Sequence, residues 1–298
     1  MLFEINMKNK KVVVRLTGGL GNQLHQYAYG VLLAKKNQAE LYIDKEFLTN
    51  YSKKLNITFR DLEINKFDVN PKYYKSIISN QFVLRILKRL RLNNVFKLLK
   101  FNIISSYIPV ADLDNNNINF YYLDGIMGLN SDYEDNIPYL LENIKINKDF
   151  FDLNEKAKSN VVEKNSVAIH IRRTDYLKAG SIHHVLGLDY YNKAINYIES
   201  IVEKPKFYVF SDDNTFVKEN FLKKNFEIII YSGENAAFFD FLSIKNCQHH
   251  IIANSTFSWW AAFMGKNDDG ITIAPSISLT VEDLDLESTY PEDWIVFE

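Results

Sequence analysis

Apolar residues occur along this chain in two alternating patterns, short continuous runs and longer stretches with helical spacing. Residues 12–16 (VVVRL) form a mostly apolar run, which predicts a buried strand. Residues 22–37 place their apolar side chains on one helical face, and residues 39–44 (AELYID) form a second strand-like run. The chain therefore opens with a predicted β-α-β unit.

The same alternation becomes regular between residues 166 and 276. The predicted strands are 166–173, 206–213, 226–233, 249–255 and 270–276, and the predicted helices between them are 189–202, 214–224, 235–247 and 257–265. Nearly continuous apolar strands that alternate with helices are typical of a parallel sheet covered on both faces.

The polar segment 154–165 separates these two regions, so we predict an α/β protein with domains at residues 1–160 and 161–298. Residues 50–150 are less regular and predict a strand only around NFYYLDG, residues 119–125. Ligands of open α/β sheets bind outside the carboxyl ends of the strands, so we expect the site in a cleft between the domains.

Composition narrows the class of protein. The 298-residue chain has a net charge of −2, which argues against general nucleic-acid binding. Its single cysteine, Cys247, excludes an internal disulfide and suits a reducing compartment. The first eleven residues do not resemble a secretory leader, and no apolar run has the length of a membrane span. We therefore expect a cytoplasmic protein.

Three glycines, Gly18, Gly19 and Gly21, lie between the first predicted strand and the first predicted helix. They match a dinucleotide-binding fingerprint whose third glycine is replaced by Leu24, with Asp44 at the position of the ribose-binding acid. Leu24 argues against NAD, because the third glycine permits close packing of the helix on the strand. A tight turn without a ligand, and another ligand that approaches the backbone closely, are the alternatives.

The motif HIRRTDY, residues 170–176, ends a predicted strand at the expected crevice. Arg172 and Arg173 are costly to bury unpaired, so they are either solvated or face an anion, and two guanidinium forks suit a pyrophosphate. His170 lies on the same face of the strand as Arg172. Asp175 is close enough to pair with one guanidinium, and a surface Arg–Asp network is the alternative.

Two further strand ends carry polar groups. Asp212 and Asp213 follow the strand that begins at Lys206; one of their carboxylates suits the N–H donors of a guanine, and capping of the next helix is the alternative. The segment ANSTFSWW, residues 253–260, joins a strand to a helix and predicts an anion site made of hydroxyls and helix amides. Its two tryptophans are predicted to pack in the core.

Signals for a metal site are weak. Cys247, His249 and His250 have the residue types of a metal site but lack further ligands, and they fit the start of a strand better. The D-x-D pattern at Asp112 and Asp114 keeps a metal–diphosphate site open as an alternative.

Residues 83–100 form a basic, amphipathic segment without an acidic residue. Four of its leucines, at 84, 87, 90 and 98, lie on one helical face. The pattern predicts either peripheral contact with an anionic membrane that carries lipid-linked acceptors, or a solvated helix that packs on its own domain.

Four motifs, in this order, resemble those of glycosyltransferase family 11, the α-1,2-fucosyltransferases. They are GGLGNQLHQYA, HIRRTDY, FYVFSDD and HHIIANSTFSWWAAF, and the likeness covers residues 12–275. His25 stands where the family usually has an aromatic residue, and residues 126–131 depart from the family pattern.

The resemblance implies a GT-B-type fold of two Rossmann-like domains facing across a cleft, with GDP-β-L-fucose as donor and with no metal or other cofactor required. It implies that Arg172 and Arg173 hold the diphosphate and that His170 and Asp212 lie near the nucleoside. The other donor-binding residues that it implies are Gly19, Gly21, Asn22, Gln23, Asp175, Asn254, Ser255, Thr256, Phe257 and Ser258.

These residues suit an inverting transfer of L-fucose to the 2-hydroxyl of a terminal β-galactose, the acceptor that the resemblance implies. Arg172 and Arg173 would act as catalytic groups, because fixed guanidiniums stabilise the charge that grows on the departing diphosphate. Asp44 and Asp124 are candidates for the base that deprotonates the acceptor hydroxyl. A fucosyltransferase of another linkage and a GDP-binding module without transfer activity are the alternatives.

Overall fold

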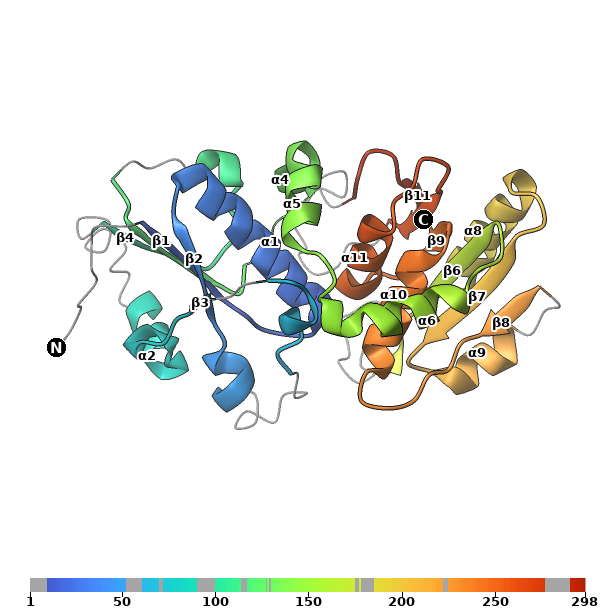
Figure 1. The fold of residues 1–298 in the computed structure, drawn as a ribbon, viewed down its shortest axis with the longest axis horizontal. Helices are drawn as coiled ribbons and strands as arrows, with labels where there is room; N and C mark the ends of the chain where they lie inside the picture. The colour runs from blue at the N-terminus through green and yellow to red at the C-terminus, as the bar shows by residue number, and fades with distance from the viewer. Residues whose placement is uncertain are drawn as a thin grey trace. The chain divides into compact units, whose positions relative to one another are not determined.

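Figure 1 shows the computed structural model of the chain, which describes residues 10–51, 61–69, 72–89, 100–113, 117–126, 128, 130–174, 177, 185–221, 225–276 and 290–297. The chain divides into two compact units, Met1–Asn147 and Lys148–Glu298. Three features predicted from the sequence, Asp114, Asp175 and the stretch 90–99 of the basic segment, lie outside the described residues.

Unit 1 is built on a sheet of five parallel strands in the order β3-β2-β1-β5-β4. The strands are β1 (Lys11–Arg15), β2 (Glu40–Asp44), β3 (Lys72–Tyr73), β4 (Phe101–Ile104) and β5 (Phe120–Asp124). The predicted β-α-β opening is confirmed. Because β1 pairs in register with β2 and β5, Arg15 lies beside both Asp44 and Asp124 at the carboxyl edge of the sheet.

Among the described residues of unit 1, the α-helices are α1 (Leu20–Asn37), α2 (Gln81–Arg89), α4 (Asn130–Tyr133) and α5 (Ile137–Asn143). Helix α1 packs on β1 and β2, and a Cβ at Gly30 would overlap Val14 Cγ2. Gly30 therefore permits the close packing of helix on strand that a dinucleotide fingerprint assigns to its third glycine.

Helix α2 packs on strands β4 and β5 through its leucines. Leu84 is buried and Leu87 packs against the same cluster, which contains Phe120 and Tyr122. This part of the basic segment thus behaves as a helix of its own unit. None of the helices within the described ranges is long and apolar enough to cross a membrane.

Unit 2 contains six parallel strands in the order β11-β10-β9-β6-β7-β8. The strands are β6 (Ser166–Ile171), β7 (Lys206–Ser211), β8 (Phe226–Ile228), β9 (His249–Ile251), β10 (Thr272–Pro275) and β11 (Ile295–Phe297). The α-helices in the described part of this unit are α6 (Phe151–Ser159), α8 (Leu188–Ile201), α9 (Asn214–Asn220), α10 (Ala236–Asn246) and α11 (Thr256–Met264). Every strand and helix predicted between residues 166 and 276 is present.

The division between the units falls earlier in the chain than the predicted boundary at residues 160 and 161. Helix α6 packs against α10 of unit 2, where the rings of Phe150 and Phe238 meet edge to face at 5.2 Å. Asn246 Nδ2 also donates to Asn154 Oδ1 at 3.2 Å. These contacts attach α6 to the second sheet, although its sequence resembles a polar linker.

Candidate functional site

The glycine loop of unit 1 has a backbone that requires glycine. Gly18 has a φ of +74°, and a Cβ there would overlap the side chain of Asn22. The carboxamide of Gln26 forms two hydrogen bonds with Thr17, the residue before Gly18. Thr17 N donates to Oε1 at 2.8 Å, and Nε2 donates to Thr17 Oγ1 at 2.9 Å. The loop is therefore fixed before any ligand arrives.

Helix α1 begins directly after this loop. Its N-cap is Gly19, whose lack of a side chain leaves the cap without a side-chain hydrogen bond, and the first turn carries no acidic residue. Gly21 is buried, whereas Gly19 and Asn22 are partly exposed. The positive end of the helix dipole thus faces this loop, an arrangement that suits an anion.

The side chain of Gln23 is occupied entirely by the backbone. Nε2 donates to Gly18 O at 2.9 Å and to Asp61 O at 2.8 Å. Oε1 accepts from Glu63 N at 2.8 Å and from Ile64 N at 3.2 Å. A carboxamide has two donors and two acceptor positions, so these four bonds use its full capacity. Gln23 ties the glycine loop to residues 61–64.

In unit 2, the motifs predicted from the sequence come together at one edge of the sheet. Strand β6 lies between β7 and β9, so the loop after β6 lies between the loops that follow its two neighbours. His170 is buried in β6, and its ring lies 5.5 Å from that of Phe257 in α11. His170 therefore joins the end of β6 to the first turn of α11.

Asp212, at the end of β7, accepts hydrogen bonds from the loop that follows β6. Oδ1 accepts from Arg173 N at 2.9 Å, and Oδ2 accepts from Thr174 N at 3.2 Å and from Thr174 Oγ1 at 2.6 Å. Arg172 Nη1 lies 3.3 Å from the same Oδ2. The carboxylate thus fixes two consecutive amides and one guanidinium.

Arg173 is held by a second carboxylate. Its Nε donates to Asp213 Oδ2 at 3.3 Å, and its guanidinium lies 3.7 Å from the centre of the Phe216 ring. Asp213 also caps α9 by accepting from Phe216 N at 3.0 Å, so the capping alternative is confirmed for this residue. The bond to Asp213 uses only Nε, which leaves four of the five guanidinium N–H groups on the Nη nitrogens.

The start of α11 lies at the same edge of the sheet, after strand β9. Ser255 is the N-cap, and its Oγ accepts from Phe257 N at 3.4 Å. Ser258 Oγ donates to the carbonyl oxygens of Ala253 and Ser255 at 3.5 and 3.3 Å. Asn254, Ser255 and Ser258 are buried, while Thr256 and Phe257 are partly exposed. Trp259 and Trp260 are buried in the core, as predicted.

The two candidate bases lie in unit 1 and are both engaged. Asp44 is fully buried; its Oδ2 accepts from Tyr122 Oη at 2.6 Å and its Oδ1 from Glu46 N at 3.0 Å. Burial and this carboxylate raise the pKa of Tyr122 above its usual range. Asp124 forms ion pairs with Arg15 and with Lys88 of α2. Asp124 therefore faces two cations.

The cysteine and histidines near β9 are structural. His250 Nε2 contacts Ile244 O at 3.0 Å, and Ile271 N donates to His249 Nδ1 at 3.1 Å. Burial lowers the pKa of His250 to about 4 and raises that of the Cys247 thiol, so the imidazole and the thiol are both neutral near pH 7. Within the described residues, no three potential ligands cluster around a metal position.

Sequence reasoning did not single out three residues that build these loops. Thr174 donates to the carboxylate of Asp212, Phe216 stacks with the guanidinium of Arg173, and Gln26 forms hydrogen bonds with Thr17. All three follow or lie within the motifs discussed above, but their roles depend on contacts between neighbouring strands and helices. Only the position of Thr174, directly after the arginine pair, offered a signal.

Comparison with known proteins agrees with this geometry. The family model for glycosyl transferase family 11 matches residues 4–298. The chain is 31% identical to the O-antigen biosynthesis glycosyltransferase WbnK of Escherichia coli, over 87% of this chain and 92% of that protein. It is 30% identical to an alpha-1,2-colitosyltransferase of Escherichia coli, over 96% of this chain and 99% of that protein.

A solved structure shares the architecture of both units. The NodZ alpha-1,6-fucosyltransferase co-crystallised with GDP superposes with a TM-score of 0.55 at 15% identity, covering 86% of this chain and 92% of that chain. This likeness establishes the fold, a GT-B-type arrangement of two Rossmann-like halves. From the match to the family along nearly its whole length, the chain belongs to glycosyl transferase family 11 and is a glycosyltransferase.

Proposed function

We propose that this enzyme transfers L-fucose from GDP-β-L-fucose, with inversion, to the 2-hydroxyl of a terminal β-galactose on a glycan. One observation carries the proposal: the two guanidiniums after β6 are fixed by Asp212 and Asp213 at the edge of the sheet where α11 also begins, in a chain that belongs to family 11. A cationic pair and a helix N-terminus at one edge suit a diphosphate.

The reaction places its electrostatic demand on the leaving group. Negative charge grows on the GDP diphosphate as the bond to the anomeric carbon breaks. Arg172 and Arg173 are about one-fifth to one-quarter exposed, so they are accessible to a ligand and already oriented by carboxylates. Such preorganised charges stabilise the transition state more than the ground state. We infer that they replace a divalent cation and that no metal is needed.

We infer that Asp212 and Gln23 position the donor site and do not contact the nucleoside or the sugar. Asp212 makes four contacts with the loop after β6, and Gln23 spends four hydrogen bonds on the backbone. A donor could engage Gln23 only by breaking these bonds, and engagement of Asp212 Oδ2, which makes three of the four contacts, would release the loop. The first turn of α1 with Gly19, Gly21 and Asn22, and residues 254–258 with His170, remain our proposed donor-binding groups.

The general base is not Asp44 or Asp124 in this proposal. Asp44 is fully buried beneath Tyr122, and Asp124 is paired with Arg15 and Lys88. Asp44 is too deeply buried to reach an acceptor hydroxyl, and both oxygens of Asp124 are already paired with cations. Both residues instead fix the carboxyl edge of the sheet in unit 1.

A second donor follows from one relative. The alpha-1,2-colitosyltransferase aligns with 96% of this chain at 30% identity. Colitose is L-fucose without its 3-hydroxyl, so the same diphosphate site serves both sugars. The discriminating contact would be a hydrogen bond to that hydroxyl, because a site built to bind a hydroxyl rejects the deoxy analogue strongly.

The test is incubation of the purified protein with GDP-fucose or GDP-colitose, with and without lactose. Release of GDP that depends on lactose, followed by assignment of the new linkage by NMR, would support the proposal. A product with another linkage would support the runner-up fucosyltransferase. If the protein binds GDP but never releases GDP from either sugar nucleotide, it is a GDP-binding module without transfer activity.

We also propose that any contact with a membrane, where a lipid-linked acceptor would be held, uses the outer face of α2. Phe82 and Ile86 are 71% and 41% exposed there, next to the exposed Arg85 and Arg89. Apolar and basic residues on one helical face suit an anionic bilayer surface. Liposome flotation with and without anionic lipid tests this, with Phe82→Glu compared with Phe151→Glu, a position in unit 2 that is 61% exposed. Equal flotation of both variants would remove the membrane idea.

A further inference from the structure

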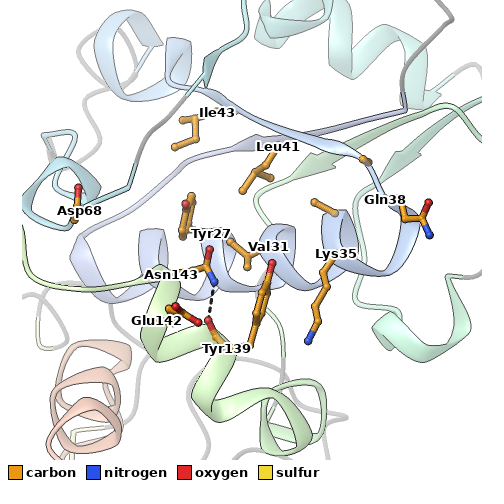
Figure 2. A pocket seen from close by; sticks show the side chains of 12 residues that line it. Tyr27, Val31, Lys35, Gln38, Leu41, Ile43, Asp68, Tyr139, Glu142 and Asn143 are labelled. Carbon is orange, nitrogen blue, oxygen red and sulfur yellow. Dashed lines mark hydrogen bonds between the residues drawn. The ribbon is translucent and has the colours of Figure 1, made fainter.

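Unit 1 contains a pocket of about 510 Å³ between α1, β2 and α5, which we call the α1–α5 pocket (Figure 2). Its floor is formed by apolar side chains of α1 and β2, including Val31, Leu41 and Ile43. Leu41 and Ile43 are two positions apart in β2, so both side chains lie on the face of the sheet that α1 covers. The polar rim comes from α5, from the end of α1 and from Asp68.

This pocket is separate from the glycine loop of the donor site. Helix α1 begins at Leu20 beside that loop, and the pocket involves the helix from Tyr27 to Gln38. At a rise of 1.5 Å per residue, Tyr27 lies about 10 Å and Lys35 about 22 Å along the axis from the start of the helix. The pocket therefore follows α1 away from the carboxyl edge of the sheet, where the loop lies.

The rim of the pocket is preorganised around a tyrosine ring. Lys35 Nζ lies 4.0 Å from the centre of the Tyr139 ring and donates to Asn136 Oδ1 at 3.0 Å. Asn143 Nδ2 donates to Tyr139 O at 2.8 Å, which orients the Asn143 carboxamide (Figure 2). Tyr27 lies opposite on α1, and burial together with Tyr139 raises the pKa of its phenol to about 12. Tyr27 is thus a neutral hydroxyl donor and acceptor.

The charges of the pocket select among ligand classes. Asp68 and Glu142 contribute two exposed carboxylates, against the single ammonium of Lys35, which already contacts Tyr139 and Asn136. A phosphate or an acidic sugar would meet net repulsion here. A neutral polyhydroxyl molecule fits better, because its hydroxyls donate to carboxylate and amide oxygens while its C–H surface covers an aromatic ring.

We propose that the α1–α5 pocket binds a neutral saccharide, namely a sugar of the acceptor glycan remote from the residue that receives fucose. This identity of the ligand rests on the proposed function. A second contact on the same glycan raises the effective concentration of its reacting end, so a long acceptor would bind more tightly than a short one. The pocket would then select acceptors by length and neutral composition, without taking part in the chemistry.

The test compares a galactose-terminated neutral tetrasaccharide with lactose, using the full chain. Protein-observed NMR titration without donor measures the dissociation constants for the wild type, Tyr139→Leu and Glu142→Gln. We expect tetrasaccharide affinity to fall roughly fivefold to tenfold in each variant, as for loss of one aromatic contact or one charge-assisted hydrogen bond. Tyr73→Leu and Glu134→Gln, exposed positions of unit 1 outside the pocket, are the matched controls.

Kinetics provide a second readout that loss of folding would not mimic. The KM for the tetrasaccharide should rise by the same factor in the pocket variants, while kcat and the KM for lactose stay at wild-type values. Failure of the wild type to bind the tetrasaccharide, unchanged affinity in both pocket variants, or equal losses in the controls would overturn the assignment. Pocket-dependent binding in a protein that transfers no fucose would support the pocket and overturn only the proposed function.

Discussion

Replacement of Asp212 by asparagine tests whether this residue positions the arginine loop or reads the nucleotide base. The substitution keeps the shape of the side chain but removes its charge and converts one oxygen to an NH₂ donor. In either amide orientation, at least one of Arg173 N and Thr174 N then faces a second donor across 2.9 or 3.2 Å. Arg172 Nη1 also loses its anionic partner.

The expected cost follows from the contacts that change. A hydrogen bond to a charged group contributes about 1.5–3 kcal/mol and a neutral one about 1 kcal/mol, so one lost and two weakened bonds cost on the order of 2–4 kcal/mol. For a unit of this size, that free energy lowers the unfolding temperature by roughly 5–10 °C. Displacement of the two guanidiniums by even an ångström would lower kcat about 100-fold.

Calorimetry and a GDP-release assay at saturating acceptor measure the two effects. Thr174→Val, which removes only the 2.6 Å hydroxyl bond, should show smaller losses in the same direction, and Thr174→Ser should restore them. Glu219→Gln, an exposed carboxylate on α9, is the control for loss of charge. Wild-type stability and turnover in Asp212→Asn, together with relaxed choice between guanine and adenine nucleotides, would refute the positioning role and identify Asp212 as a base-reading residue.

Four further predictions concern separate parts of the molecule. Arg172→Ala should lower kcat roughly 100- to 1000-fold with an unchanged circular dichroism spectrum, and normal turnover in a folded variant would contradict the proposed catalysis. Gly18→Ala should destabilise by about 1–2 kcal/mol in urea titrations because of its positive φ, whereas Gly187→Ala, where a Cβ meets nothing closer than 4.0 Å, should not. Transfer should survive excess EDTA; rescue of a lost rate by Mg²⁺ would disprove metal independence. Burial raises the pKa of Asp240 to about 7 from 3.8, so the stability that its neutral carboxyl contributes is full below pH 4 and is lost as pH rises through 7. Asp240→Asn should therefore raise the free energy of unfolding by on the order of 2 kcal/mol at pH 8 and by less at pH 5. An equal increase at both pH values would contradict this.

The second half of the chain was predictable because its strands carry their own signal. Strands buried on both faces, such as β6 and β7, are continuous apolar runs, and the polar residues that follow each run mark the carboxyl edge. The placement of Arg172, Asp212 and Ser255 at one edge follows from parallel strands alone. What required the structure was the strand order, which makes β6 the neighbour of both β7 and β9.

The first half was less predictable for identifiable physical reasons. Strand β4 begins at Phe101, directly after a basic amphipathic segment that hides the change of period from helix to strand. Strand β3 is two residues long, too short for any pattern. The ion pairs of Asp124 join β5 to Arg15 of β1 and to Lys88 of α2. These residues lie 109 and 36 positions away, so the local sequence does not indicate the pairs.

The motifs of this family contain two kinds of polar residue, which sequence reasoning does not distinguish. Gln23, Gln26, Asp212 and Asp213 each form at least one hydrogen bond with the backbone of a neighbouring loop or helix and so help to build the loops. The arginine pair differs, because a guanidinium has five N–H groups and the bond from Arg173 to Asp213 uses only one of them. Binding of a diphosphate requires donors that stay available after the loop is built. A motif residue whose capacity is already spent on the fold is therefore better assigned to positioning, however suitable its chemistry would be for the ligand.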